Sequence, residues 1–154
     1  MEMATKYETP HPLLDRLNAL LRGELTAMTT YRRAAEEQSH YALRALEEEH
    51  REAAEALREH IAALGGQPAE NTGIWGVWAR AVEGLAKRLG RGAQALALRE
   101  GEEHGIRTYE NALLEDELDP ETRALIQSHL LPKAQAHLSV LHDCFEINPP
   151  EAER

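Results

Sequence analysis

The chain has 154 residues and a single cysteine, which suffices for one domain and excludes both an intramolecular disulfide and a cysteine-based zinc site. Its net charge of −10 argues against nucleic acid and acidic lipid surfaces as partners, because both require a basic patch. The low aromatic content of 5% and the abundance of Ala, Leu, Glu and Arg favour long helices over strands.

Two long helices are predicted in the first half of the chain, over residues 12–38 and 41–64, after a loose polar arm at residues 1–11. Apolar side chains recur along both segments at helical spacing, and a Gly-Gly pair followed by proline ends the second. Only two or three residues separate the helices, so they are expected to form an antiparallel hairpin.

A much longer link follows, over residues 65–92. Part of it, residues 73–89, has the pattern of a short amphipathic helix that carries Trp75 and Trp78. A link of this length can travel the length of a long helix, so the next helix can run parallel to the second one. We expect the two tryptophans to cap the helices or to fill an interface.

Two further helices are predicted over about residues 93–117 and 119–145, again with a short connection that indicates a second hairpin. The last helix begins with an aspartate followed by proline, a pattern typical of a helix N-terminus. Pro132 lies inside this helix, where it removes one backbone hydrogen bond and is expected to cause a kink. The predicted domain therefore covers residues 12–146, followed by a flexible tail at 147–154.

Two of the predicted helices carry the same short pattern. Glu24 precedes Tyr31 by seven residues, and Glu102 precedes Tyr109 by seven residues in an equivalent sequence context. Seven residues are two helical turns, so each glutamate shares a helix face with its tyrosine. A buried glutamate needs a partner, and a metal ion would supply one. The tyrosines either bond to a carboxylate on a neighbouring helix or are ordinary core residues.

Polar side chains interrupt the apolar stripe of all four helices near the middle: Glu24, Glu47, His50, Glu102 and His137. Glu47 and His50 are three residues apart and face the same way, whereas Glu48 and Glu49 are expected to point elsewhere. Carboxylates and imidazoles that converge in a core require a cation between them. Their oxygen and nitrogen donors suit iron, with manganese and zinc as alternatives.

With these residues the chain resembles the ferritin-like superfamily of ferritins, bacterioferritins and rubrerythrins over residues 12–145. Those proteins place one Glu on each of two helices and a Glu-x-x-His motif on each of the other two. The resemblance assigns the single glutamates to Glu24 and Glu102 and the full motif to Glu47 and His50. The fourth helix departs from the pattern, because His137 is present but Ala134 replaces the expected glutamate.

The chain also resembles a bacterial ferritin-like branch of unknown function, which has a similar Gly-Glu…Tyr helix and a late histidine. The resemblance implies an all-α, ferritin-like four-helix bundle of two antiparallel hairpins, joined by a long crossover with a short fifth helix. It implies metal ligands at Glu24, Glu47, His50, Glu102 and His137. Tyr31 and Tyr109 resemble the tyrosines that orient ligands in such sites. Because Ala134 removes one ligand, the sequence leaves open whether one or two metal ions are held.

Three functions remain open from the sequence. The first is a metal-binding protein that holds iron and acts as an oxidase or a peroxide scavenger. The second is a non-catalytic helical interaction or stress protein, in which the buried polar residues form a metal-free network. The third is a storage subunit of a cage. Because no signal peptide or membrane span is recognised, we expect a cytoplasmic protein. We also expect it to form a homodimer or a higher homo-oligomer.

Overall fold

The computed structural model describes residues 11–73, 76, 80–81 and 85–146, and this part of the chain is helical without a strand. The prediction of an all-α protein is therefore confirmed. The elements are α1 (Pro12–Gln38), α2 (Tyr41–Ala63), α4 (Leu85–Leu89), α5 (Arg91–Leu113), α6 (Pro120–Leu125), the π-helical turn η1 (Ile126–Leu130) and α7 (Leu131–Glu146). Residues 1–10, the predicted tail at 147–154 and both tryptophans lie outside the described residues.

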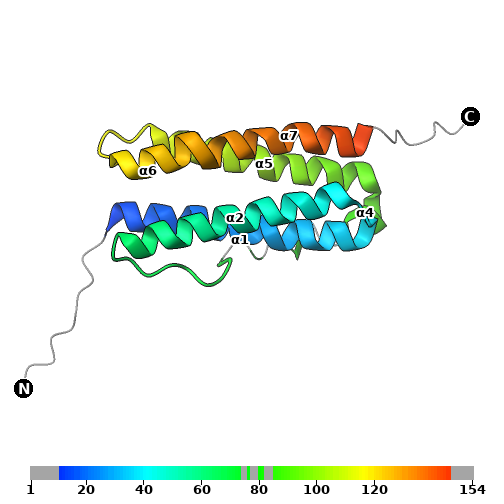
Figure 1. Cartoon of the computed structure of the whole chain (residues 1–154). Coiled ribbons are helices and arrows are strands. Elements are labelled where there is room, and N and C mark those ends of the chain that lie inside the picture. Colours follow the sequence, from blue (N-terminus) through cyan, green and yellow to red (C-terminus); the bar gives the residue numbers. More distant parts are fainter. Residues whose placement is uncertain (1–10, 74–75, 77–79, 82–84, 147–154) are drawn as a thin grey trace, which may run out of the picture.

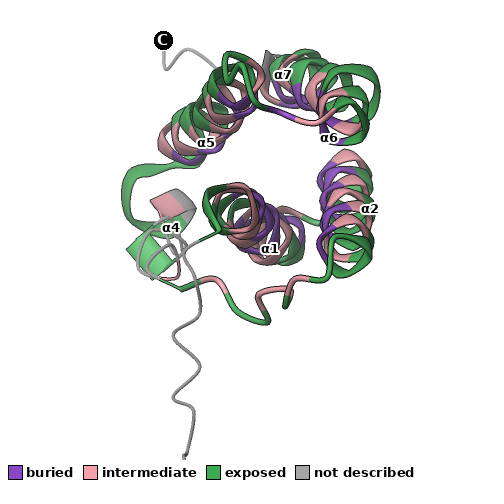
Figure 2. Cartoon of the chain, turned by 90° about the vertical axis from the view of Figure 1, so that its left-hand side faces the viewer, coloured by how far each residue is buried: buried purple, intermediate pink, exposed green. Residues whose placement is uncertain are grey.

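The long helices lie side by side with their axes roughly aligned (Figure 1). α1 and α2 run in opposite directions and pack extensively against each other, and α5 runs antiparallel to the continuous α6–η1–α7 segment. Seen along the helix axes, the buried positions of α1, α2, α5 and α7 face a shared interior (Figure 2). Among the described residues, no helix is both long enough and apolar enough to traverse a bilayer.

Side chains and a left-handed residue fix the turn between α1 and α2. Ser39 adopts φ 51, in the left-handed region, and its N–H donates to the Ala35 carbonyl at 2.8 Å, which closes the end of α1. His40 then caps α2, because its Nδ1 accepts a hydrogen bond from the Ala42 N–H at 3.2 Å. This tight reversal brings the polar residues of α1 and α2 to the same level.

The predicted limits of the third long helix need correction. The sequence predicts residues 93–117, whereas α5 starts at Arg91, directly after Gly90 at φ 89, and ends at Leu113. The residues beyond it include the acidic run Glu115, Asp116 and Glu117. Negative charges oppose the dipole at a helix C-terminus, which explains why the helix stops before them.

The structure accommodates Pro132 by a local change of helix type. The turn η1 ends at Leu130, two residues before the proline, and the Leu131 N–H donates to the Ile126 carbonyl, five residues earlier. Widening one turn to a π-helix allows the chain to continue as α7 despite the missing proline N–H. The buried positions of η1 and α7 are Ile126, Leu130, Ala134, His137, Leu141 and Cys144.

The apolar core is divided into two clusters. One contains Leu17, Leu21, Leu57, Ile61 and Ile126, and the other contains Leu43, Leu46, Leu98 and Leu141. Each long helix carries a buried polar residue close to the point where its core residues pass from one cluster to the other: Glu24 on α1, His50 on α2, Glu102 on α5 and His137 on α7. The fold therefore places a layer of titratable side chains across the middle of a largely apolar interior.

One stability prediction concerns the start of the last helical segment. The Asp119 carboxylate accepts a hydrogen bond from the Thr122 N–H at 2.9 Å and caps α6. We expect Asp119→Ala to lower the free energy of unfolding by about 1 kcal/mol, measured by urea denaturation. The exposed Asp116 in the preceding turn is the control, and Asp116→Ala should change stability by less than about 0.5 kcal/mol. Equal effects of the two substitutions would show that the cap does not matter.

Candidate metal centre

All five side chains predicted as metal ligands are buried, with 3–8% of each residue exposed. They are Glu24 of α1, Glu47 and His50 of α2, Glu102 of α5 and His137 of α7. Burial of this many titratable groups is costly unless they are paired, so their contacts decide what the polar layer can do. Four of the five converge, and the fifth, Glu47, does not.

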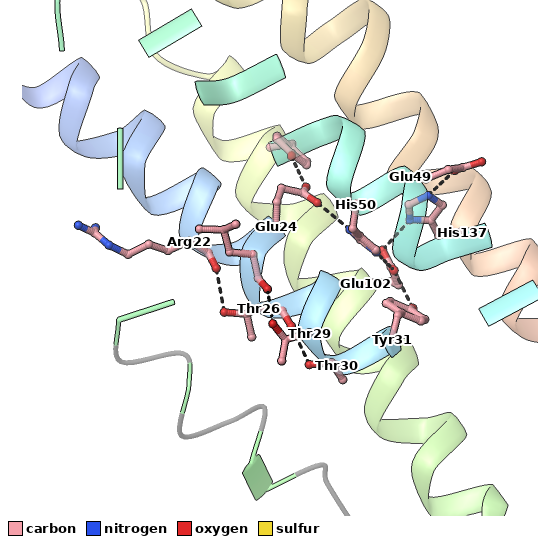
Figure 3. Close-up of polar contacts among 12 residues, drawn as sticks. Arg22, Glu24, Thr26, Thr29, Thr30, Tyr31, Glu49, His50, Glu102 and His137 are labelled. Carbon is pink, nitrogen blue, oxygen red and sulfur yellow. Dashed lines mark hydrogen bonds and ion pairs between the residues drawn. The ribbon is translucent and has the colours of Figure 1, made fainter. Parts of the chain in front are cut away.

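His50 links two helices across the interior. Its Nδ1 lies 2.6 Å from Oε2 of Glu24, and its Nε2 lies 2.8 Å from Oε1 of Glu102. The ring also stacks on Tyr31, with centroids 5.1 Å apart and an interplanar angle of 18°. Both ring nitrogens are therefore engaged by carboxylates, and the ring orientation is fixed by packing as well as by hydrogen bonds (Figure 3).

His137 is held in the same manner from the other side of Glu102. Its Nδ1 lies 3.3 Å from Oε2 of Glu102, and its Nε2 lies 2.6 Å from Oε2 of Glu49 (Figure 3). The two imidazoles meet edge to face, with centroids 4.7 Å apart. Each histidine thus turns one nitrogen toward Glu102 and its other nitrogen toward a second carboxylate.

His50, Glu102 and His137 form a compact group of potential ligands. One donor atom from each residue can be chosen so that all three lie within 4.8 Å of one another. Two imidazoles and one carboxylate make a donor set suited to a borderline metal such as iron or zinc. The group, together with the flanking Glu24 and Glu49, is called the histidine–carboxylate cluster below, and it could hold one metal ion.

Glu47, the α2 carboxylate predicted as a ligand, lies apart from this cluster. Glu47 Oε1 pairs with the Arg32 Nε at 2.9 Å and also lies 3.7 Å from Arg51, so Glu47 does not join the ligand group. Glu49, expected to point elsewhere, reaches His137 instead. Helical spacing places Glu47 and His50 on one broad face, but the guanidinium of Arg32 draws the Glu47 carboxylate away. No spacing within α2 could have revealed a partner of Glu49 on α7.

The two tyrosines make reciprocal contacts between α1 and α5. Tyr31 of α1 donates a hydrogen bond to Oε1 of Glu102 at 2.7 Å, and Tyr109 of α5 donates to Oε1 of Glu24. The alternative of a bond to a carboxylate on a neighbouring helix is therefore confirmed for both residues. The crossed pairing follows from the repeat, because equivalent Glu and Tyr positions on two antiparallel helices face one another.

The contacts shift the pKa values in opposite directions. Burial by itself would lower the pKa of His50, but the Glu24 carboxylate and the hydrogen bonds to Glu102 and Glu24 outweigh it and raise the pKa to about 10. Burial disfavours ionised Glu102, yet hydrogen bonds to His137 and His50 hold its pKa well below the usual range. Without a metal, His50 is therefore an imidazolium between two carboxylates at neutral pH.

Burial raises the pKa of both tyrosines well above its ordinary value, and the carboxylate next to each hydroxyl adds to the effect, Glu102 for Tyr31 and Glu24 for Tyr109. Both hydroxyls therefore stay protonated and act as hydrogen-bond donors. A donor of this kind fixes the orientation of the carboxylate that accepts from it, and orientation matters for a group that would bind a metal.

A test of this role follows from the same contacts. We expect Tyr31→Phe to weaken metal binding by about tenfold, because Glu102 loses the donor that orients it. Isothermal titration of the metal-free protein with Mn²⁺ or Zn²⁺ measures the effect. Tyr41, which is 84% exposed, provides the control Tyr41→Phe, which should bind as the unaltered chain does. Unchanged affinity in Tyr31→Phe would leave the tyrosine with a packing role only.

Two further residues with side chains that could ligate a metal lie outside the histidine–carboxylate cluster. His104 is exposed, as its position two residues after Glu102 indicates. Cys144 is buried, and its Sγ lies 4.0 Å from Nδ1 of His40, so it does not join the histidine–carboxylate cluster. Burial and the nearby Asp143 raise the pKa of the Cys144 thiol, which favours the inert protonated form.

Residues 13–115 match a protein family described as DUF2383, a domain of unknown function. The chain belongs to the DUF2383 family. The match covers well over half of the chain and includes Glu24, Glu49, His50 and Glu102, but it ends before His137. No curated protein and no solved structure gives a significant match to the chain.

Proposed function

We propose that this DUF2383 protein binds a single divalent metal ion, iron, through His50, Glu102 and His137, within a ferritin-like four-helix bundle. One observation carries the proposal. His50 Nε2 and His137 Nδ1 both face Glu102, while the opposite nitrogen of each ring bonds to its own carboxylate, Glu24 or Glu49. A histidine that ligates a metal usually donates its other ring N–H to a carboxylate, which fixes the tautomer and raises ligand basicity.

The donor set supports one metal ion in place of the two that a complete ferritin-like site holds. Ala134 supplies no carboxylate from α7, and Glu47 is engaged by Arg32. Two histidines and one carboxylate with open coordination positions are typical of non-haem Fe(II) sites that react with oxygen. We therefore propose oxidation or peroxide removal as the class of reaction, with Mn²⁺ and Zn²⁺ as alternative metals.

A metal-free polar network is the second candidate, and a different observation favours it. Glu24, Glu102, His50 and His137 already form hydrogen bonds with one another without a metal ion. Among the described side chains, the only buried polar atom without a partner is Oδ2 of Asp119, which lies outside the cluster. A fully satisfied network of this kind can specify a unique packing without any ligand.

Metal analysis of the purified protein separates the two candidates. The metal proposal predicts about one Fe, Mn or Zn per chain, with a melting temperature that falls on removal by a chelator, because the metal binds only the folded state. The network candidate predicts no stoichiometric metal and no stabilisation by added metal. If metal is bound, oxygen or peroxide consumption by the iron-loaded chain tests turnover, and no consumption would leave a binding protein without that activity.

A further inference from the structure

A cavity of about 600 Å³ lies between α1 and α5, beside the histidine–carboxylate cluster. Its inner lining includes Glu24, His50 and Glu102, and its outer lining includes the exposed residues Glu100 and Arg107, so it connects the polar layer with the surface. Its volume falls within the range of pockets that bind small organic molecules.

The helices that border the cavity carry small residues at equivalent positions, in keeping with the sequence repeat. These positions are Gly23, Ala27 and Thr30 on α1, and Gly101, Gly105 and Thr108 on α5. A Cβ added at Gly23 or Gly105 would meet no atom within 4 Å. Glycine inside a helix costs about 1 kcal/mol relative to alanine, and packing within the chain does not demand it at these two positions. The glycines keep space open that the fold itself does not use.

The cavity lacks free hydroxyl donors. Thr26, Thr30 and Thr108 each donate to a main-chain carbonyl of their own helix at 2.8 Å, as Figure 3 shows for the first two. Tyr31 and Tyr109 donate to Glu102 and Glu24. Every hydroxyl in the lining therefore donates its hydrogen bond within the protein, and only its oxygen can accept a hydrogen bond from a ligand. A ligand must supply the hydrogen in any bond to these groups.

Three of the four carboxylates that line the cavity have a basic partner. The buried Glu24 and Glu102 lie 2.6 and 2.8 Å from the two ring nitrogens of His50. At the outer end, Glu103 pairs with Arg99 at 2.9 Å, and Glu100 and Arg107 are opposite in sign. Carboxylates and acceptor oxygens disfavour an anion. Because most of the carboxylates already have basic partners, the cavity gives a cation little advantage. Leu20, Leu98 and Ala134 provide apolar walls.

We propose that the α1–α5 cavity binds a small uncharged organic molecule of the alcohol class, which donates its hydroxyl hydrogen to the carboxylate end and packs its apolar body along the glycine and alanine walls. The hydroxyl hydrogen that the ligand donates distinguishes an alcohol from molecules of similar shape that have no donor. At the inner end of the cavity the hydroxyls and carboxylates present only acceptor oxygens, so an analogue whose oxygen can only accept gains no hydrogen bond there and sets like partial charges against each other.

The test uses a matched set of probes on the metal-stripped full chain: cyclohexanol, cyclohexanone and cyclohexanecarboxylate, titrated by NMR. Cyclohexanol should bind saturably, and the ketone and the carboxylate at least about tenfold more weakly. Chemical-shift changes should centre on residues of α1 and α5. Failure of all three probes to bind, or equal binding of the ketone and the alcohol, would overturn the proposal. Neither result depends on whether the protein takes up metal.

A variant that fills the cavity gives a second test. Gly23→Leu combined with Gly105→Leu places side chains in the open space and should abolish cyclohexanol binding without loss of helicity. Gly92→Leu is the matched control, because Gly92 is an exposed α5 glycine with no atom within 4 Å of an added Cβ and does not line the cavity. Cyclohexanol binding that persists in the double variant would place the binding site elsewhere and overturn the proposal.

Discussion

Glu102→Gln should reduce metal affinity by more than about a hundredfold, whereas Glu47→Gln should change it by less than about threefold. Both glutamates are buried and both were predicted as ligands from the sequence. Only Glu102 faces His50 and His137, and the amide of glutamine would replace one of its oxygens with a donor nitrogen. Isothermal titration with Mn²⁺ or Zn²⁺, after removal of any metal by a chelator, measures both affinities.

The two variants control for each other, because each replaces one buried carboxylate with an amide of nearly the same shape. Circular dichroism and the melting temperature would show that both fold. Glu47→Gln removes an ion pair with an Arg32 side chain that is 45% exposed, so its effect on stability should be small. Loss of metal binding in Glu47→Gln with retention in Glu102→Gln would make Glu47 the ligand of the Glu-x-x-His motif and contradict the ligand set proposed from the structure.

The metal-free protein should become less stable as the pH rises, and metal binding should become stronger over the same range. The pKa of His50 is raised from 6.5 to about 10 by folding. A raised pKa means that the folded state holds the proton more tightly than the unfolded state. The stability contributed by His50 is therefore complete below pH 6.5 and is lost progressively as the pH approaches 10. Urea denaturation between these limits should show a fall of a few kcal/mol.

Metal affinity should rise with pH, opposite to the stability of the metal-free protein, because a metal ligand must be deprotonated. Binding to His50 Nε2 releases the proton that His50 holds near neutral pH, so the affinity should rise by about tenfold per pH unit below the pKa of His50. Titrations in buffers of different ionisation enthalpy would count the released proton. The control is His50→Gln, which should lose both the fall in metal-free stability and the proton release. A metal affinity that does not change between pH 6.5 and 8.5 would contradict the predicted role of His50.

Residue spacing predicts part of the contacts in the repeated Glu–Tyr pattern, which consists of Glu24 with Tyr31 and Glu102 with Tyr109. A separation of seven residues fixes a common helix face, and that face is buried in both helices. The sequence could therefore predict that each tyrosine meets a carboxylate. It could not establish that the pairs cross between helices, because this requires that α1 and α5 lie side by side with the two repeats at the same level.

Glu47 and Glu49 show where helical spacing fails. They lie on opposite flanks of His50, and the neighbouring helix on each flank decides where each carboxylate goes. Arg32 of α1 forms an ion pair with Glu47, and His137 of α7 pairs with Glu49. Periodicity defines the direction of a side chain to within a broad face, but the long polar side chain then selects the best partner in reach. That choice requires the relative positions of three helices.

Two further features of the structure could not be predicted from the sequence, for different reasons. The sequence predicts a kink at Pro132, since proline removes a backbone donor, whereas the π-helical turn at Ile126–Leu130 depends on the packing of the whole segment. The α1–α5 cavity was not predicted at all. It arises because two separate glycine-containing helix faces meet, and no single segment reveals the space between them.

An anomalous diffraction experiment on crystals grown with Fe²⁺, Mn²⁺ or Zn²⁺ tests the proposed metal centre most directly. Data collected at the absorption edge of the metal should give one strong peak per chain, about 2.0–2.2 Å from His50 Nε2, His137 Nδ1 and a Glu102 oxygen. Glu24 and Glu49 should keep their bonds to the far nitrogens of the two rings. An interior without a peak in crystals that contain the metal, or a peak between Glu47 and the protein surface, would contradict the account.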